Sequence, residues 1–245
     1  MIVSWFSAGV SSAVATKMAI QRFGEVKVIY THIEDQHEDT MRFIKDCEEW
    51  FGIEIEIQQS PLISVENACL QSAYMVSPNG AACTRLLKRR VRKEWELNNL
   101  GNEYIWGFDF EERERAGRMS ESTPDNVHHF PLIDAGITKK RAHGILRKQG
   151  VKRPAMYDMG YPNNNCVGCL RGGMGYWNKI REDFTEVFES RCQLEEKLAL
   201  IMQGKVGARI FKDFKLRDLT IGRGRDQKVI VPDCGLFCDI DYSSQ

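Results

Sequence analysis

A chain of 245 residues is long enough to bury a sizeable core, and we expect one α/β domain with a C-terminal elaboration. Its 42% hydrophobic and 28% charged residues are typical of soluble globular proteins. Lysine and arginine (34) balance aspartate and glutamate (34), so no global field favours a nucleic acid or a membrane surface. No apolar run approaches the length of a membrane span, and a strand that begins at residue 2 leaves no room for a signal peptide. We therefore expect a cytoplasmic protein.

The beginning of the chain has the pattern of a strand, a tight turn and a helix. An apolar run over residues 2–6 enters a turn of small residues, Ser7-Ala8-Gly9-Val10-Ser11-Ser12. A strand-to-helix turn presents backbone N–H groups to an anion, and Gly9 lets the backbone approach a ligand closely. Ser7, Ser11 and Ser12 add hydroxyl donors. The turn therefore predicts either a phosphate-binding loop or only the closure of a first βα unit.

The following segments alternate strand and helix patterns. Strand patterns cover residues 26–33, 53–57, 103–109 and 127–134. Helical patterns cover residues 12–22, 41–50, 138–148 and 176–203, with two more helical pieces between residues 60 and 100. Helical crossovers between successive strands favour parallel pairing with right-handed connections. The sequence therefore predicts an α/β fold with a three-layer, mostly parallel sheet.

Three charged segments follow these elements, and each has two interpretations. Residues 34–40 follow the second strand and residues 110–118 follow the fourth, where open α/β sheets place ligand contacts. The alternatives are a solvated loop with a helix cap and an exposed helix with internal charge pairs. Residues 85–93 carry six basic side chains, which predict either a solvated helix face offset by Glu94 and Glu96 or an anion clamp.

The eight cysteines are typical of thiols in a reducing compartment rather than of a disulfide framework. Those in helical patterns are expected in the core: Cys47, Cys69 and Cys192. Those beside glycine, asparagine or proline are expected in loops: Cys83, Cys166, Cys169, Cys234 and Cys238. Four thiolates complete a tetrahedral site, and soft sulfur ligands favour an iron–sulfur cluster or zinc. Redox-active or simply buried thiols remain the alternatives.

The first motifs resemble those of the phosphoadenylyl-sulfate (PAPS) reductases and the related N-type ATP pyrophosphatases. The turn at residues 7–12 is similar to their pyrophosphate loop Ser-Gly-Gly-x-Asp-Ser, with Ala8 in place of the second residue and Ser11 in place of Asp. Cys83-Thr84-Arg85-x-x-Lys88 resembles the signature Cys-Cys-x-x-(Arg/Lys)-Lys, with Thr84 in place of the second cysteine. The resemblance covers about residues 1–185 and a short tail motif.

Later motifs extend this resemblance in the same order. Gly107-x-Asp109-x-x-Glu112-x-x-Arg115 is similar to a family element whose arginine binds the anionic end of the nucleotide. Pro131-Leu132-Ile133-Asp134 resembles a family strand, and Gly160-Tyr161-x-x-x-x-Cys166-x-x-Cys169 resembles a segment of cluster-bearing adenylyl-sulfate reductases. Asp233-Cys234-Gly235-Leu236 resembles the C-terminal Glu-Cys-Gly-(Leu/Ile)-His, whose cysteine attacks the sulfur of the activated sulfate. Here Asp233 replaces Glu and Phe237 replaces His.

The resemblance implies an adenine nucleotide alpha hydrolase-like fold. It divides the chain into a nucleotide-binding domain (residues 1–150) and a cysteine-rich helical segment (residues 151–245) that packs on the same domain. The implied nucleotide contacts are Ser7, Gly9, Ser11, Ser12, Lys88, Glu112 and Arg115. The implied metal ligands are Cys83, Cys166, Cys169 and Cys238, for a 4Fe-4S cluster or alternatively zinc. Cys234 is the implied nucleophile, although a ligand role or a redox pair with Cys238 stays open.

The function that follows is an oxidoreductase or sulfurtransferase that acts on an adenine nucleotide. One version reduces an activated sulfate (PAPS or adenylyl sulfate), and the other uses ATP to transfer sulfur to a nucleic acid. The candidate partners are the nucleotide, a tRNA or DNA acceptor, a thioredoxin-like reductant and a second copy in a homodimer, with no membrane. The alternative is a non-catalytic nucleotide- or nucleic-acid-binding module with structural zinc, which Ala8 and Ser11 keep open.

Overall fold

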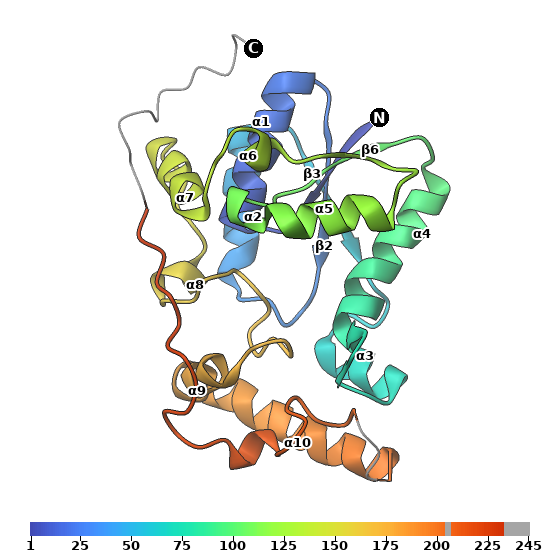
Figure 1. Cartoon of the computed structure of the whole chain (residues 1–245), viewed down its shortest axis with the longest axis vertical. Helices are drawn as coiled ribbons and strands as arrows, with labels where there is room; N and C mark the ends of the chain where they lie inside the picture. Colours follow the sequence, from blue (N-terminus) through green and yellow to red (C-terminus); the bar gives the residue numbers. More distant parts are fainter. Residues whose placement is uncertain (204–206, 233–245) are drawn as a thin grey trace.

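The computed structural model describes residues 1–203 and 207–232, and its centre is a parallel sheet of five strands (Figure 1). The strands are β1 (Ile2–Phe6), β2 (Lys27–His32), β3 (Ile55–Gln59), β6 (Glu103–Ile105) and β7 (Val127–His129), in the order β3-β2-β1-β6-β7. β1 is central, with Val3 opposite both Lys27 and Tyr104. The chain builds outward through β2 and β3 and then crosses to β6 on the other side of β1. Such a reversal makes a crevice at the carboxyl ends of the strands, where ligands bind.

One face of the sheet is covered by helices that alternate with the strands. They are α1 (Val10–Phe23), α2 (Asp39–Phe51), α6 (Pro131–Asp134) and α7 (Lys139–Lys148). Phe6, Tyr30, Phe43 and Leu146 are among the residues that form the core between sheet and helices. Within the described residues, no helix has both the length and the apolar character needed to cross a membrane.

The opposite face of the sheet is covered by α4 (Arg90–Asn98). Trp95 of this helix packs with Val3 and Ile29, and its ring meets Trp5 edge-on at 5.6 Å. This orientation is favourable for aromatic pairs. The sheet is therefore the middle of three layers, and the predicted α/β class with a mostly parallel sheet is confirmed.

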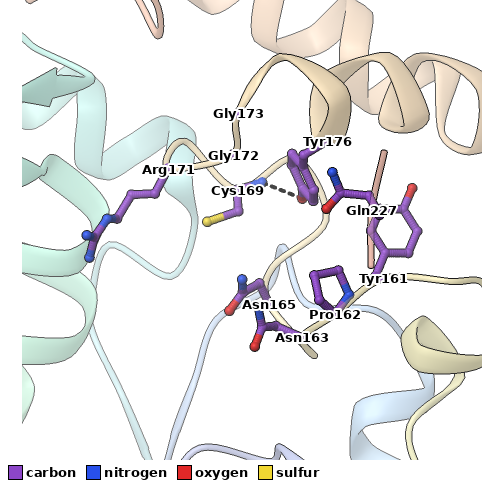
Figure 2. A pocket seen from close by; sticks show the side chains of 10 residues that line it. All are labelled: Tyr161, Pro162, Asn163, Asn165, Cys169, Arg171, Gly172, Gly173, Tyr176 and Gln227. Atoms are coloured by element: carbon purple, nitrogen blue, oxygen red, sulfur yellow. Dashed lines mark hydrogen bonds between the residues drawn. The ribbon is translucent and has the colours of Figure 1, made fainter. Parts of the chain in front are cut away.

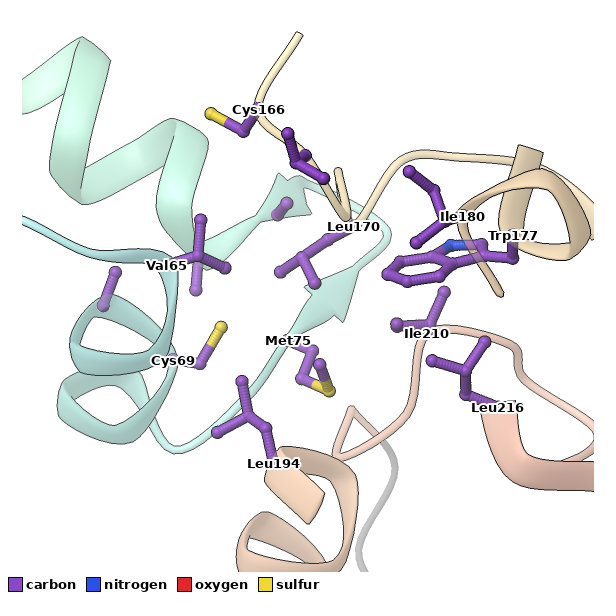
Figure 3. Packing of buried hydrophobic residues seen from close by; sticks show 14 of the residues in the cluster. Val65, Cys69, Met75, Cys166, Leu170, Trp177, Ile180, Leu194, Ile210 and Leu216 are labelled. Atoms are coloured by element: carbon purple, nitrogen blue, oxygen red, sulfur yellow. The ribbon is translucent and has the colours of Figure 1, made fainter. Parts of the chain in front are cut away.

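A second core joins two distant parts of the sequence below the sheet (Figures 1 and 3). The earlier part contains α3 (Val65–Ser72), β4 (Val76–Ser77), β5 (Gly80–Ala81) and η1 (Thr84–Arg89). The later part contains α9 (Met174–Asp183), α10 (Thr185–Ile201) and η3 (Leu216–Asp218). Figure 3 shows Cys69 and Met75 of the first part packed with Leu170, Trp177 and Leu194 of the second. The domain division at residue 150 stays a prediction, and residues 65–87 contribute to the core of the later segment.

The remaining elements are two short helices and the α5 helix. Here α8 spans Ala155–Asp158, η2 spans Phe110–Glu112 and α5 spans Arg113–Ser122. Two segments differ from the sequence prediction. Residues 131–134 form a helix, because Pro131 occupies its first turn, where the missing N–H costs nothing and the fixed φ is helical. The single helix expected over residues 176–203 is two helices that meet at Phe184, whose φ of −140° is extended.

The expected core cysteines are confirmed. Cys47 and Cys69 have no exposed surface and Cys192 is 1% exposed. Burial raises the pKa of Cys47, raises that of Cys69 to about 12 and raises that of Cys192 to about 11. These thiols are protonated and inert at neutral pH.

Candidate functional site

The turn between β1 and α1 is organised by the hydroxyl group of Ser12. Its Oγ accepts hydrogen bonds from Ser7 Oγ at 2.9 Å and from Ser7 N at 3.2 Å, and it donates to Gly9 O at 2.9 Å. A third donor, the N–H of Gly9, lies 3.3 Å from the same oxygen. The turn is therefore closed around one side chain. The first-turn amides of α1, at Ser11 and Ser12, have no acceptor within the helix, as at the start of any helix.

Ala8 adopts a conformation that normally favours glycine. Its φ is +54°, in the left-handed region, and its side chain is fully buried. The neighbouring segment braces this strained position, because Asn164 Nδ2 donates to Ala8 O at 2.8 Å. Tyr157 adds a second brace, with its hydroxyl oxygen 3.4 Å from Val10 N. The family pattern has glycine at this position, and the left-handed backbone is the physical reason.

Gly107 allows the chain after β6 to pass directly over this turn. A Cβ atom at residue 107 would lie 2.4 Å from Ser12 Cα and 2.8 Å from Ser12 N. Such contacts do not occur between real atoms, so only glycine fits. The chain then enters η2, where buried Asp109 accepts a hydrogen bond from Glu111 N at 3.1 Å. Burial raises the pKa of Asp109, and the nearby Glu112 raises it further.

A cavity of about 160 Å3, which we call the loop cavity, lies at the carboxyl ends of β1 and β2. Ser7 lies on its wall, together with Lys88 and Arg89 of η1 and Arg92 of α4. Aromatic rings and amide or hydroxyl groups complete the lining: Trp5, Phe6, Tyr30, Trp106, Thr31 and Gln36. The cavity lies where the strand order reverses, between β1 and the chain that leaves β6. It combines cations and hydroxyl groups with flat apolar rings, which suits a nucleotide.

The basic run splits into two sets. Arg90 and Arg92 pair with carboxylates one turn on, at 2.7 Å to Glu94 and 3.3 Å to Glu96. Lys88 and Arg89, by contrast, form no ion pair with a carboxylate of the described residues, and both are exposed at the loop cavity. Arg90 and Arg92 therefore fit the solvated helix face, and the anion clamp stays a prediction for Lys88 and Arg89.

The cations at the cavity lie on an unusual helix. Residues 84–89 form a π-helix, in which Arg90 N donates to Arg85 O five residues back. Cys83 is the residue that immediately precedes this helix. Lys88 lowers the pKa of Cys83, against the larger effect of burial, which raises it. π-Helical turns are rare and frequently occur at functional sites.

Three of the predicted metal ligands lie in the second core or against it. Cys83 and Cys169 pack against the second core, in which Cys166 is buried (Figure 3). Burial raises the pKa of Cys166 to about 12, with a contribution from Cys169, while Lys88 acts in the opposite direction. Cys169 also raises the pKa of Cys83. The structure thus brings together thiols that are up to 86 residues apart in sequence (from Cys83 to Cys169).

The Cys166–Cys169 loop is held by one side chain and by one backbone contact to a distant segment. The Tyr176 hydroxyl accepts from Cys169 N at 2.9 Å and donates to Cys166 O at 3.1 Å. Val167 N donates to the backbone oxygen of Asp35, just after β2, at 2.8 Å. Gly168, at φ +71°, makes the turn, and a Cβ there would lie 2.7 Å from Val187. The loop is therefore a fixed part of the fold.

The Asp35 carboxylate links three elements at the same place. One oxygen pairs with Arg191 of α10, whose side chain is 5% exposed, and the other accepts from Val65 N at 2.6 Å. Residues 34–40 had two interpretations, ligand contact or a solvated loop with a helix cap, and the Asp35 carboxylate has a structural role that neither described. Its neighbour Asp39 also acts structurally. The Arg42 guanidinium holds the pKa of the Asp39 carboxyl low, helped by a hydrogen bond from Ala155 N at 2.7 Å.

The sequence predicted a metal site at Cys83, Cys166, Cys169 and Cys238, and three of these residues are described by the structure. Over residues 1–203 and 207–232, no three side chains of His, Cys, Asp or Glu are arranged so that they could hold a metal ion. The described thiols thus do not complete a four-thiolate site. Cys238, the fourth predicted ligand, and Cys234, the predicted nucleophile, lie outside the described residues.

The predicted pair Glu112 and Arg115 lies on the other side of the β6 crossing. Arg115 Nη1 contacts Glu112 Oε1 at 2.6 Å, and its guanidinium stacks 4.6 Å above the Phe108 ring. Phe108 stacks in turn on Trp106, which lines the loop cavity. Both residues are therefore near the loop cavity but do not line it.

The sequence analysis did not identify several residues of the site. They are Trp5, Tyr30, Gln36, Arg92, Trp106 and Tyr176. Arg89 and Arg92 were part of the basic run without being singled out. The sequence has a glycine near Tyr176 at residue 172, and the structure shows the reason for it: a Cβ at residue 172 would lie 2.0 Å from the Tyr176 ring. The aromatic residues of the loop cavity could not be recognised from the sequence, because an aromatic residue in a strand is more often part of the core.

Comparisons with known proteins add the following. The family model described as "Phosphoadenosine phosphosulfate reductase domain" matches residues 1–172. No curated protein matches the chain significantly. Among solved structures, phosphoadenylyl-sulfate (PAPS) reductase from Candida auris, in a phosphate complex, is similar over 67% of this chain and 80% of that chain, with 12% sequence identity and a TM-score of 0.49.

Proposed function

The chain belongs to the phosphoadenosine phosphosulfate reductase domain family, and we propose that it is an enzyme that binds an adenine nucleotide in the loop cavity and carries out sulfur chemistry beside it. The reaction is of the oxidoreductase or sulfurtransferase class. Reduction of an activated sulfate is the version proposed here. The observation that supports it is that Ser7 of the loop and the unpaired Lys88 line one cavity, while Lys88 also acts on the thiols Cys83 and Cys166.

The phosphate groups would bind at the start of α1. The first-turn amides at Ser11 and Ser12 would donate to the phosphate oxygens, next to Gly9, while Ser7, whose hydroxyl donates to Ser12 Oγ, would hold the loop in this shape. The positive end of the helix dipole adds to this attraction. Lys88 and Arg89 would hold the anionic end, because they have no carboxylate partner among the described residues. Arg115, held by Glu112, would contribute when a ligand extends past Trp106.

Cys234 would act as the nucleophile of this reaction. Its thiolate attacks the sulfur of the activated sulfate, so that an S–S bond forms. The bond from that sulfur to the phosphate oxygen breaks, and the nucleotide leaves with the electron pair. A thiol reductant then attacks Cys234, forms a disulfide with it and releases sulfite. Basic side chains before the tail, such as Arg223 and Lys228, would favour the thiolate.

The metal ligands are part of the proposal. Cys83, Cys166 and Cys169 come from the described residues, and Cys238 would be the fourth ligand of a 4Fe-4S cluster or of zinc. The thiols suit either metal by their chemistry. Since the described residues do not complete such a site, no reaction step is assigned to the metal.

The test is turnover by protein purified without oxygen, with iron, zinc and acid-labile sulfide measured on the same sample. With adenylyl sulfate or PAPS and a thiol reductant, we expect sulfite release that Cys234→Ser abolishes. ATP with an added tRNA or DNA, followed by pyrophosphate release and sulfur incorporation, would instead show the transferase reaction. Nucleotide binding without turnover, together with zinc and no sulfide, would leave only a binding module.

A further inference from the structure

A second cavity, which we call the thiol cavity, opens beside Cys169 and shares no lining residue with the loop cavity (Figure 2). It measures about 200 Å3. Tyr161 and Tyr176 form its buried floor, Asn163 and Asn165 lie at its rim, and Gln227 reaches it from the C-terminal part of the chain. Figure 2 shows the sulfur of Cys169 pointing to the side on which Arg171 lies, with Tyr161, Tyr176 and Gln227 opposite. Cys169 thus lines a cavity that is separate from the loop cavity.

Some of the polar groups that line this cavity are available to a ligand, and others are already hydrogen-bonded. The amides of Asn165 and Gln227 make no hydrogen bond with a described residue, whereas Asn163 Oδ1 accepts from Lys139 at 2.6 Å. Both tyrosine hydroxyls are used elsewhere, by Asp183 at 2.8 Å and by the Cys166–Cys169 loop. The tyrosines thus present rings rather than hydroxyl groups to the cavity.

Charge and size restrict the ligand. Arg171 is the charged residue of the lining, and no carboxylate lines the cavity, so an anionic group is attracted rather than repelled. The side-chain amides of Asn165 and Gln227 can donate to a carboxylate through their NH2 groups or accept from an ammonium group through their oxygens. Cavities that hold drug-sized ligands measure about 300–1,000 Å3. This one fits a molecule about as large as a single amino acid.

We propose that the thiol cavity binds a small thiol of amino-acid size that carries a carboxylate group, with its sulfur next to Cys169. The inference rests on the proposed function, because the proposed reaction consumes a thiol reductant besides the nucleotide. A separate cavity lets that molecule approach from the side that the nucleotide does not occupy. Binding is the whole of the proposal, and no covalent step is included.

The test is calorimetric titration of the full chain, kept without oxygen, with L-cysteine as the probe and L-serine as the probe that lacks only the sulfur. L-cysteine should bind, and L-serine should bind at least about tenfold more weakly. Asn165→Leu and Gln227→Leu should each weaken L-cysteine binding by about tenfold, because each removes a hydrogen-bonding amide. Gln193→Leu, an exposed glutamine on α10, is the matched control and should leave binding unchanged. Thermal unfolding checks that every variant is folded.

Three results would overturn the proposal: no binding of L-cysteine to the folded wild type, equal binding of L-serine, or unchanged binding in both cavity variants. Nucleotide binding is measured on the same samples, so the two proposals can fail separately. Nucleotide binding without L-cysteine binding overturns only the thiol site. L-cysteine binding without nucleotide binding overturns the proposed function and leaves the cavity assignment in place.

Discussion

The hydroxyl group of Tyr176 accepts a hydrogen bond from the backbone N–H of Cys169 at 2.9 Å. The same hydroxyl donates to Cys166 O at 3.1 Å, so one side chain of α9 spans the Cys-x-x-Cys loop. Tyr176 is 8% exposed, and burial raises its pKa. The phenol is therefore neutral and keeps its proton for the Cys166 carbonyl. The geometry of two candidate sulfur ligands thus depends on a residue outside their motif.

We predict that Tyr176→Phe loosens this loop without unfolding the protein. The ring stays in the core, while the N–H of Cys169 and the carbonyl of Cys166 lose their partner, which costs about 1–3 kcal/mol. The measurement is the rate of Cys169 alkylation in protein stripped of metal, which should rise. Tyr74→Phe removes a hydroxyl that bonds only to exposed Arg85 and is the control. Equal alkylation rates in wild type and Tyr176→Phe would show that the phenol does not hold the loop.

Gly107→Ala should disrupt the phosphate loop through steric contact alone. The added Cβ would lie 2.4 Å from Ser12 Cα, and backbone atoms on both sides must move. Overpacking of this kind costs about 1–3 kcal/mol, and the shifted Ser12 should also weaken nucleotide binding. Gly117→Ala is the matched control, because nothing lies within 4 Å of its Cβ and it is inside helix α5. That variant should be as stable as wild type or more stable by up to about 1 kcal/mol. Similar melting temperatures for the two variants would contradict the close approach of β6 to the loop.

Asp35→Asn should be among the most destabilising single changes in the described part of the chain. It leaves the guanidinium of Arg191 buried without a charge partner, and breaking a buried pair in this way costs about 3–5 kcal/mol. Urea unfolding measures the loss. Lys197 lies on α10, as Arg191 does, and forms an exposed ion pair with Glu66 of α3. Lys197→Ala breaks that pair and should cost no more than about 1 kcal/mol. A loss below about 1 kcal/mol for Asp35→Asn would mean that Arg191 does not depend on this carboxylate.

Acid should destabilise the fold through His143. This residue is 2% exposed, its Nε2 has no hydrogen-bond partner, and burial lowers its pKa from 6.5 to about 3, with Arg153 adding to the effect. Because the unfolded state binds the proton first, stability is fully present above pH 6.5 and falls as the pH drops toward 3. The slope from this group approaches about 1.4 kcal/mol per pH unit. His143→Phe should flatten the stability profile between these pH values. An unchanged slope in that variant would rule out His143 as its source.

Local patterns were enough to predict much of the fold. The strand–turn–helix at residues 2–23 and the three core cysteines follow from periodicity within a few residues. The segment at Pro131 was misread because a short apolar run after a strand has no period that separates strand from helix. The sequence could not separate the anion clamp from the solvated helix face, because it does not show which basic residues among 85–93 have carboxylate partners.

The parts of the site that sequence reasoning missed depend on contacts between distant residues. Asp35 and Arg191 are 156 positions apart, and no local rule pairs them. The π-helical turn that carries Lys88 and Arg89 to the loop cavity has no propensity signal. Trp106 looks like an ordinary strand aromatic until the β6 crossing places it on the loop cavity.

The central claim is that an adenine nucleotide binds in the loop cavity with Lys88 at its anionic end. Its most direct test is calorimetric titration of wild type, Lys88→Met and Lys93→Met with PAPS and ATP. Lys93 follows on the same basic run but does not line the loop cavity, so it controls for loss of one positive charge. We expect wild type and Lys93→Met to bind equally and Lys88→Met to lose about tenfold or more in affinity, because a charge-assisted contact disappears. Equal affinity in all three folded proteins, or no binding to wild type, would contradict the claim.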